Sequence, residues 1–172
     1  MKKETISIRR KETSIKLQAS QINSIRVKDI ERKAVRVFQN GKIGISGAVG
    51  NSSIEELTAQ AVENLSSNIP YPYELESTKK DHRNYAISHY SEAELMKLTE
   101  RILDHLNSEF DDFIFGESVK SIEIDYKMDN SEGLDLRYQD ERLEIGFMVK
   151  AKSSSNLFDT FTGWEGRIIR NA

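Results

Sequence analysis

The chain has 172 residues, of which 37% are hydrophobic and 31% charged, so it is long and apolar enough for a folded domain and too patterned for disorder. Its formal net charge is −3, and the chain as a whole offers no attraction to the phosphate backbone of nucleic acids. The absence of cysteine excludes disulfides, thiol nucleophiles and thiolate metal ligands.

The first ten residues carry basic side chains but no apolar run of the length found in signal peptides. No segment approaches the roughly 20 apolar residues that a membrane-spanning helix needs. We therefore expect a soluble, cytoplasmic protein that has no membrane partner and binds no nucleic acid directly.

Apolar and polar residues alternate through most of the first fifty positions, which predicts short strands with one buried and one wet face. Polar connections are expected around Lys11-Glu12, around Ser20-Gln21 and over residues 29–32, as in an antiparallel meander. The alternating apolar positions are Ile6 and Ile8; Ile15, Leu17 and Ala19; Ile25 and Val27; Val35 and Val37; and Ile43 and Ile45.

Asn40-Gly41 gives the strongest turn signal of the chain. Both residue types tolerate the positive φ of a type I′ turn, and alternating apolar residues flank them on both sides. We assign this pair a structural role as the turn of a hairpin.

Two helices are predicted by capping boxes, Ser53-Ile-Glu-Glu56 and Ser91-Glu-Ala-Glu94. Each box opens a segment whose apolar residues recur at helical spacing and form one stripe. Between the helices, residues 66–90 contain both prolines of the chain and are expected to form a loop across one end of the sheet. The two stripes are Ile54, Leu57, Ala61, Val62 and Leu65, and Leu95, Leu98, Ile102 and Leu106.

The chain returns to strands at Val119. Alternation is clear over 122–128 and 134–138, with a tight turn at 129–133, and the longest strand is expected over 143–151. The order strands, helix, loop, helix, strands predicts an α+β fold in a single domain, 1–172. Its sheet is largely antiparallel, built from an N-terminal meander and C-terminal strands, with two main helices on one face.

Motif searches identify no catalytic, cofactor-binding or metal-binding residue. His82, His89 and His105 lack the spacing of zinc ligands, and no serine lies in a G-x-S-x-G elbow. Glycines recur at positions 41, 44, 47 and 50, but inside and just after a hairpin strand, where close backbone packing explains them better than a phosphate loop.

Three aromatic residues gather near the end of the chain, in "LFDTFTGWEG". Phe158 and Phe161 are compatible with a core, and Trp164 equally with a partner surface. We take Phe158, Phe161 and Trp164 together as the candidate interface.

The stretch "AVRVFQNGKIGISGAVGNSSIEELTAQAVENL" resembles a block of the TldD/PmbA family, once described as modulators of DNA gyrase and now regarded as metallopeptidases. The later stretch "MDNSEGLDLRYQDERLEIGFMVKAKSSSN" resembles a second block of that family. Both occur in the family's order, with a variable region between them. The resemblance covers nearly the whole chain and points to the N-terminal domain of such proteins.

The resemblance implies a non-catalytic domain that helps to enclose or present peptide substrate and to assemble the dimer. Family peptidases carry a His-Glu-x-x-x-His zinc motif in a following C-terminal domain; the motif is absent from this chain, so we expect zinc only in such a domain and no activity from this chain alone. The implied partners are that C-terminal metallopeptidase domain, a second subunit in a homodimer or in a heterodimer with a paralogue, and unfolded peptide.

Two other interpretations stay open. The chain could be a stand-alone interaction or assembly module with no link to proteolysis, or an enzyme of another kind with a site in the Tyr71–His89 loop. A His-Glu-x-x-x-His segment beyond Ala172 in the natural reading frame would favour the metallopeptidase interpretation over the module.

Overall fold

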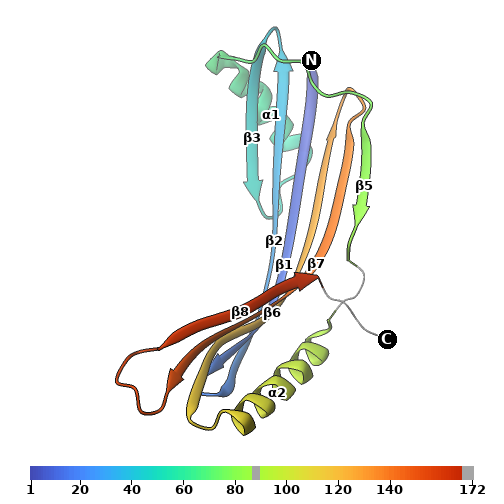
Figure 1. The fold of residues 1–172 in the computed structure, drawn as a ribbon. Coiled ribbons are helices and arrows are strands. Elements are labelled where there is room, and N and C mark those ends of the chain that lie inside the picture. The colour runs from blue at the N-terminus through green and yellow to red at the C-terminus, as the bar shows by residue number, and fades with distance from the viewer. Residues whose placement is uncertain (87–89, 168–172) are drawn as a thin grey trace. The chain divides into compact units, whose positions relative to one another are not determined.

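The computed structural model describes residues 1–86 and 90–167, and His89 therefore lies outside the described residues (Figure 1). The helices are α1 (Ile54–Glu63), the short 3-10 helix η1 (Asn64–Ser67) and α2 (Glu92–Glu109). The strands are β1 (Lys2–Gln18), β2 (Gln21–Gln39), β3 (Lys42–Val49), β4 (Ile69–Pro70), β5 (Lys80–Asn84), β6 (Phe113–Asn130), β7 (Asp135–Ala151) and β8 (Thr160–Arg167).

The strands form one sheet in the order β4-β3-β2-β1-β6-β7-β5, and β8 pairs with a further part of β7. The pairs β2–β3, β3–β4 and β7–β8 are antiparallel, whereas β5 runs parallel to β7. A largely antiparallel sheet with two main helices confirms the predicted α+β class.

The chain divides into two compact units. Unit 1 comprises residues 1–10, 29–85 and 124–140, and unit 2 comprises residues 11–28, 86–123 and 141–172. The long strands β1, β2, β6 and β7 each contribute residues to both units, and each unit has its own helix and its own apolar core.

In unit 1, α1 packs against β2 and β3. Ser53 caps the helix as predicted: its hydroxyl accepts from the Glu56 amide, and the Glu56 carboxylate accepts from the Ser53 amide. Figure 1 shows α1 lying along these strands. The buried residues that form this core are Val35 and Val37 of β2 and Leu57 and Ala61 of α1.

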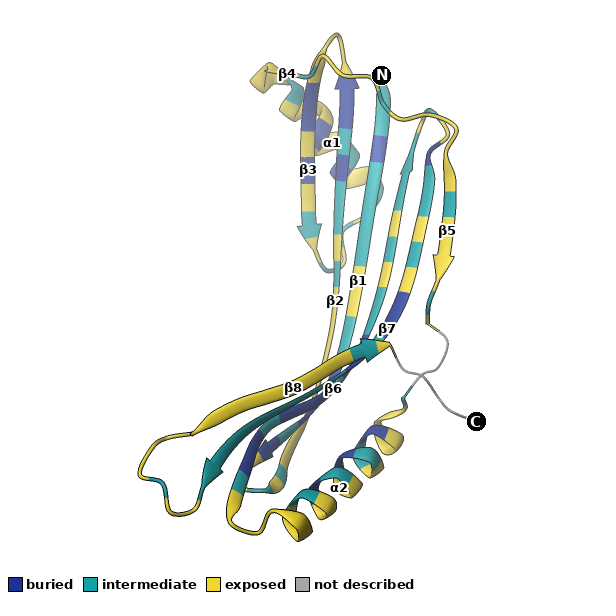
Figure 2. Ribbon diagram, viewed as in Figure 1, coloured by how far each residue is buried: buried dark blue, intermediate teal, exposed yellow. Residues whose placement is uncertain are grey.

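In unit 2, α2 covers the sheet. Ser91 and Glu94 form the second predicted capping box at its start. The core that the helix closes is buried, as the dark ribbon segments of Figure 2 show, and consists of Ile15, Leu17, Leu95, Leu103, Val119 and Leu143.

Two of the turns predicted in the first fifty residues are wrong. The chain continues as strand through Lys11-Glu12 in β1 and through 29–32 in β2. Polar residues there are cross-strand partners: Arg9 binds Asp29 through two hydrogen bonds, and Lys11 pairs with Glu123 at 3.1 Å. Ala19 and Ser20 form the hairpin turn that connects β1 and β2, one residue before the predicted position.

The predicted loop over residues 66–90 contains the short strands β4 and β5, and a further strand, β8, follows the predicted last one. The predicted strands 134–138 and 143–151 are joined in the single strand β7. Among the described residues, no helix combines the length and apolar character needed to cross a membrane.

Candidate functional site

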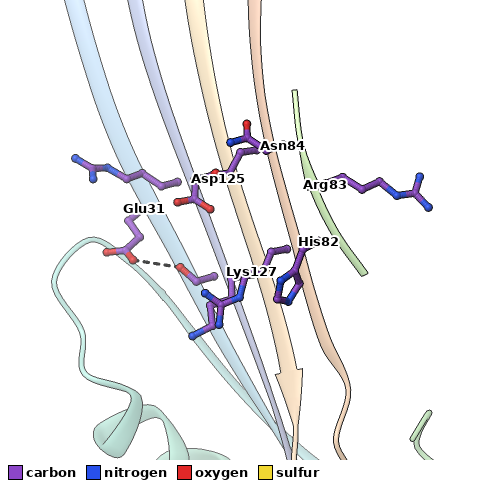
Figure 3. Close-up of a pocket in the computed structure, with 10 residues that line it drawn as sticks. Glu31, His82, Arg83, Asn84, Asp125 and Lys127 are labelled. Carbon is purple, nitrogen blue, oxygen red and sulfur yellow. Dashed lines mark hydrogen bonds between the residues drawn. The ribbon is translucent and has the colours of Figure 1, made fainter. Parts of the chain in front are cut away.

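An open cavity of about 450 Å³ lies on one face of unit 1 (Figure 3). Five strands contribute to it, and every lining side chain is polar or charged. The lining residues are Ser7 and Arg9 of β1, Glu31 of β2, Asp125 and Lys127 of β6, Arg137 and Gln139 of β7, and His82, Arg83 and Asn84 of β5.

Strand register explains why these residues meet. The parallel pairing of β5 with β7 places His82 beside Arg137 and Asn84 beside Gln139, so the four side chains leave the sheet on one face. Glu31 shares the alternation of Val35 on β2, and Val35 faces α1. Helix α1 therefore covers one part of this face and leaves the cavity open on the part over the neighbouring strands.

Asp135 contacts two side chains that line one wall of the cavity, Arg137 and His82. Its carboxylate accepts from Arg137 Nε at 3.1 Å and lies 3.0 Å from His82 Nε2. The hydrogen bond from Arg137, supported by that from His82, lowers the pKa of Asp135 below its ordinary value, although partial desolvation opposes the shift. The pair of contacts holds His82 and Arg137 side by side on adjacent strands.

The opposite wall is built from paired groups. Arg9 donates through Nε and Nη2 to the two oxygens of Asp29, at 2.9 and 2.6 Å. Glu31 accepts from the Ser7 hydroxyl at 3.2 Å, shown as the dashed line in Figure 3, and pairs with Lys33 at 3.1 Å. Because these groups already have partners within the protein, they shape the cavity and are less available to bind a ligand.

Arg83 lines the cavity but does not point into it. Figure 3 shows its side chain directed away from the other labelled residues. Its guanidinium forms a fork with both carboxylate oxygens of Asp81, with the shortest distance at 2.7 Å, and this hydrogen bonding lowers the pKa of Asp81.

A second set of lining groups has little or no internal partner. In the described parts of the chain, no hydrogen bond is made by the Arg137 terminal nitrogens, by the Gln139 side chain or by the Asp125 carboxylate. Lys127 Nζ lies 3.9 Å from Asp129, which is beyond hydrogen-bond distance. Two cations, one amide and one carboxylate are therefore available to a ligand.

Within residues 1–86 and 90–167, no three histidine, aspartate or glutamate side chains are placed to hold a metal ion. His82 is engaged with Asp135, and His105 lies on α2 in unit 2. The side chains that line the cavity offer hydrogen bonds and charge.

The predicted structural turn lies in unit 1, where Asn40 and Gly41 connect β2 and β3. Their φ angles are 52° and 69°, and Gln39 pairs with Lys42 across the two-residue loop. This is the geometry that a type I′ turn requires.

The candidate interface residues lie in or beside β8 of unit 2, and all three are exposed: Phe158 by 48%, Phe161 by 64% and Trp164 by 52%. The register pairs Phe161 with Met148 and Trp164 with Ile145, three positions apart, so the two rings leave β8 on opposite faces. Phe161 packs over Gly146, and Trp164 lies over Gly166. The three residues therefore do not form one continuous patch.

Sequence patterns did not identify the cavity. Its residues carry no motif, and β5, which supplies three of them, has the wholly polar sequence Lys-Asp-His-Arg-Asn. The signal that was present is charged residues at alternate positions of one strand, as in Asp125 and Lys127 of β6, but such charges are ordinary on a wet sheet face.

No protein-family model and no curated protein matches the chain. Solved structures do match. TldE from Thermococcus kodakarensis superposes with a TM-score of 0.79 at 13% identity, over 97% of this chain and 40% of that one. A "putative modulator of a DNA gyrase" from Thermotoga maritima superposes with a TM-score of 0.72 at 16% identity, over 95% of this chain and 38% of that one.

A third structure, a "putative modulator of DNA gyrase" from Bacteroides thetaiotaomicron, matches with a TM-score of 0.68 at 8% identity, over 96% of this chain and 40% of that one. The chain thus spans about two fifths of each of these proteins. The chain has the fold of this part of TldE and of the two other proteins, which confirms at the level of structure the resemblance to the TldD/PmbA family.

Proposed function

We propose that the chain is the non-catalytic part of a TldD/PmbA-like metallopeptidase assembly and that it presents unfolded peptide to a catalytic domain. The observation that carries the proposal is the match of nearly the whole chain to about two fifths of TldE. A catalytic domain in the remaining length of such a protein would supply the zinc. Among the described residues of this chain, no three histidine, aspartate or glutamate side chains are placed to hold a metal ion.

Strand addition is the binding mode that the fold supports. In the sheet order, β5 is the last strand, and among the residues that the structure describes it pairs with β7 alone, which leaves its other edge for an extended peptide. A strand added there satisfies main-chain groups whatever the peptide's sequence. Because β5 also lines the polar cavity, a bound peptide would have the cavity's charged side chains within reach.

Amide hydrogen exchange with a short unstructured peptide tests this proposal. We expect the amides of β5 to become protected on peptide addition, the amides of β8 to stay unchanged, and the peptide to be recovered intact by mass spectrometry. Protection confined to β8, or no protection at all, would contradict peptide handling at β5. Cleavage of the peptide by the purified chain would contradict its non-catalytic role.

A stand-alone assembly module is the second candidate, and β8 favours it. Within the part of the chain that the structure describes, this edge strand pairs only with β7, and most of its ribbon is coloured as exposed (Figure 2). Its residues Phe161 and Trp164 are both exposed. A module of that kind would self-associate through β8 and leave β5 unprotected by peptide.

A further inference from the structure

Among the described residues, some cationic groups that line the polar cavity of unit 1 are fully paired with a carboxylate and others are not. Three of its cationic or basic groups have aspartate partners beside the cavity: Arg9, Arg83 and His82. Arg137 is different, because Asp135 engages only its Nε and the terminal nitrogens stay open. Lys127 also faces the cavity, with its closest described carboxylate 3.9 Å away.

We propose that this cavity binds a peptide carboxylate, held by the Arg137 fork and by Lys127. This inference rests on the proposed peptide-handling function and names the chemical group that the site recognises. The two terminal nitrogens of a guanidinium match the two oxygens of a carboxylate, and Asp135 fixes the orientation of the fork through Nε. Lys127 adds a second positive charge in the same cavity.

Two further lining residues, Gln139 and Asp125, indicate which hydrogen-bonding groups the ligand carries beside its carboxylate. Gln139 can donate and accept beside the carboxylate, and Asp125 can accept from a peptide N–H or an ammonium group. Asp125 and Glu31 also place negative charge in the cavity, and the paired aspartates lie just outside it. A dianionic phosphate is therefore expected to bind less favourably here than a peptide that has one carboxylate and neighbouring N–H donors.

The carboxylate can come from the C-terminus of a peptide or from an aspartate or glutamate side chain. Three matched peptides separate these sources: one with a free C-terminus, the same peptide with an amidated C-terminus, and an amidated version with one added glutamate. Binding is measured by fluorescence anisotropy, together with protection of the β5 amides. We expect the free acid, the glutamate peptide or both to bind more tightly than the plain amide.

Substitutions then locate the contact. Arg137→Gln and Lys127→Gln should each reduce the preference for the carboxylate by roughly two- to fivefold, as expected for half-exposed ion pairs. Arg32→Gln is the matched control, because Arg32 is an exposed residue of β2 that does not line the cavity, and it should leave the preference unchanged. Lys127→Gln removes no internal hydrogen bond, so its effect cannot arise from loss of Asp135 anchoring.

The outcomes separate the two proposals. If all three peptides protect β5 and bind equally well, peptide handling stands and the carboxylate site is wrong. If no peptide binds, both proposals fail. An equal loss of preference in Arg32→Gln, or competition by inorganic phosphate at concentrations where acetate has no effect, would also overturn the carboxylate assignment.

Discussion

Gly44 of β3 lies directly against the carbonyl oxygen of Ala61 in α1, so close that a β-carbon at position 44 would overlap that oxygen. Ala61 is itself fully buried and belongs to the core of unit 1. The depth at which α1 sits on the sheet is therefore set by the absence of a side chain on a strand residue. Of the four recurring glycines, Gly44 and Gly47 thus show the predicted close approach to backbone, whereas no atom lies within 4 Å of a β-carbon added at Gly41 or Gly50.

Gly44→Ala should destabilise the protein, because either α1 or β3 must move to admit the methyl group. We expect a loss of about 1–3 kcal/mol, the usual cost of overpacking a core. Gly116→Ala is the control, since an added β-carbon there would be in ordinary van der Waals contact, with Met148 Cε nearest at 3.5 Å. Chemical denaturation of both variants checks this, and an equal effect at the two positions would argue against the packing explanation.

The parts of the fold that could be predicted from the sequence are those with a local physical signal. Ser53 and Ser91 form their capping boxes, and the apolar stripes that follow lie on α1 and α2, except for Leu65, which lies in η1. These signals depend only on residues within one or two turns. The Asn40-Gly41 turn has a local signal of the same kind.

The missed features depend on residues far apart in the sequence. Strand β5 has no apolar residue, so its place in the sheet depends on parallel pairing with β7, more than fifty positions later. The polar residues of the false turn at 29–32 are partners of another strand, as Asp29 with Arg9 shows. The cavity follows from both features, because β5 closes one side of it and ion pairs between strands line the other.

Gly41→Val should destabilise the hairpin between β2 and β3. No atom lies within 4 Å of an added β-carbon, so the cost is that of holding a branched L residue at a φ of 69°. We expect a loss of at least about 1 kcal/mol in the free energy of unfolding. Gly41→Asn should cost less, because asparagine tolerates this region, and an unchanged melting temperature for the valine variant would exclude the assigned turn geometry.

Ala19→Asn should stabilise the protein. Ala19 and Ser20 form the turn between β1 and β2 at φ angles of 50° and 62°, which neither residue type favours. Asparagine accepts a positive φ more readily, and we expect a gain of up to about 1 kcal/mol. Ser20 is left in place because its hydroxyl accepts from the Phe115 amide at 3.0 Å. Ala19→Val should lower the melting temperature, and a rise in both variants would contradict the strain argument.

Asp159 should titrate below the ordinary aspartate range. Hydrogen bonds from the Ser154 hydroxyl, the Ala151 amide and the Asn156 side chain lower its pKa. Because the folded pKa is lowered, the stabilising contribution is complete above the unfolded pKa and is lost as the pH falls through the folded pKa. The Ala151 amide shift, followed by NMR, should move with this low midpoint in the native chain and should not titrate in Asp159→Asn. A midpoint at or above the ordinary value would show that the three contacts do not form in solution.

The last prediction concerns association through β8. In the described residues this strand pairs with β7 on one side only, and Phe161 and Trp164 expose large rings on its two faces. An open strand edge with apolar side chains favours pairing with another chain, at roughly 25 cal/mol per Å² of apolar surface buried before the entropic cost of docking. We therefore expect dimers or larger species at high concentration, measured by sedimentation equilibrium. Trp164→Ser and Phe161→Ser each remove a ring from a different face, so the variant with the larger effect identifies the buried face.

Tyr73→Ser is the control, because Tyr73 is 73% exposed in unit 1 and should not affect association. A strict monomer across the accessible concentration range would refute the prediction, and unfolding of Trp164→Ser in place of dissociation would show that its ring belongs to the core.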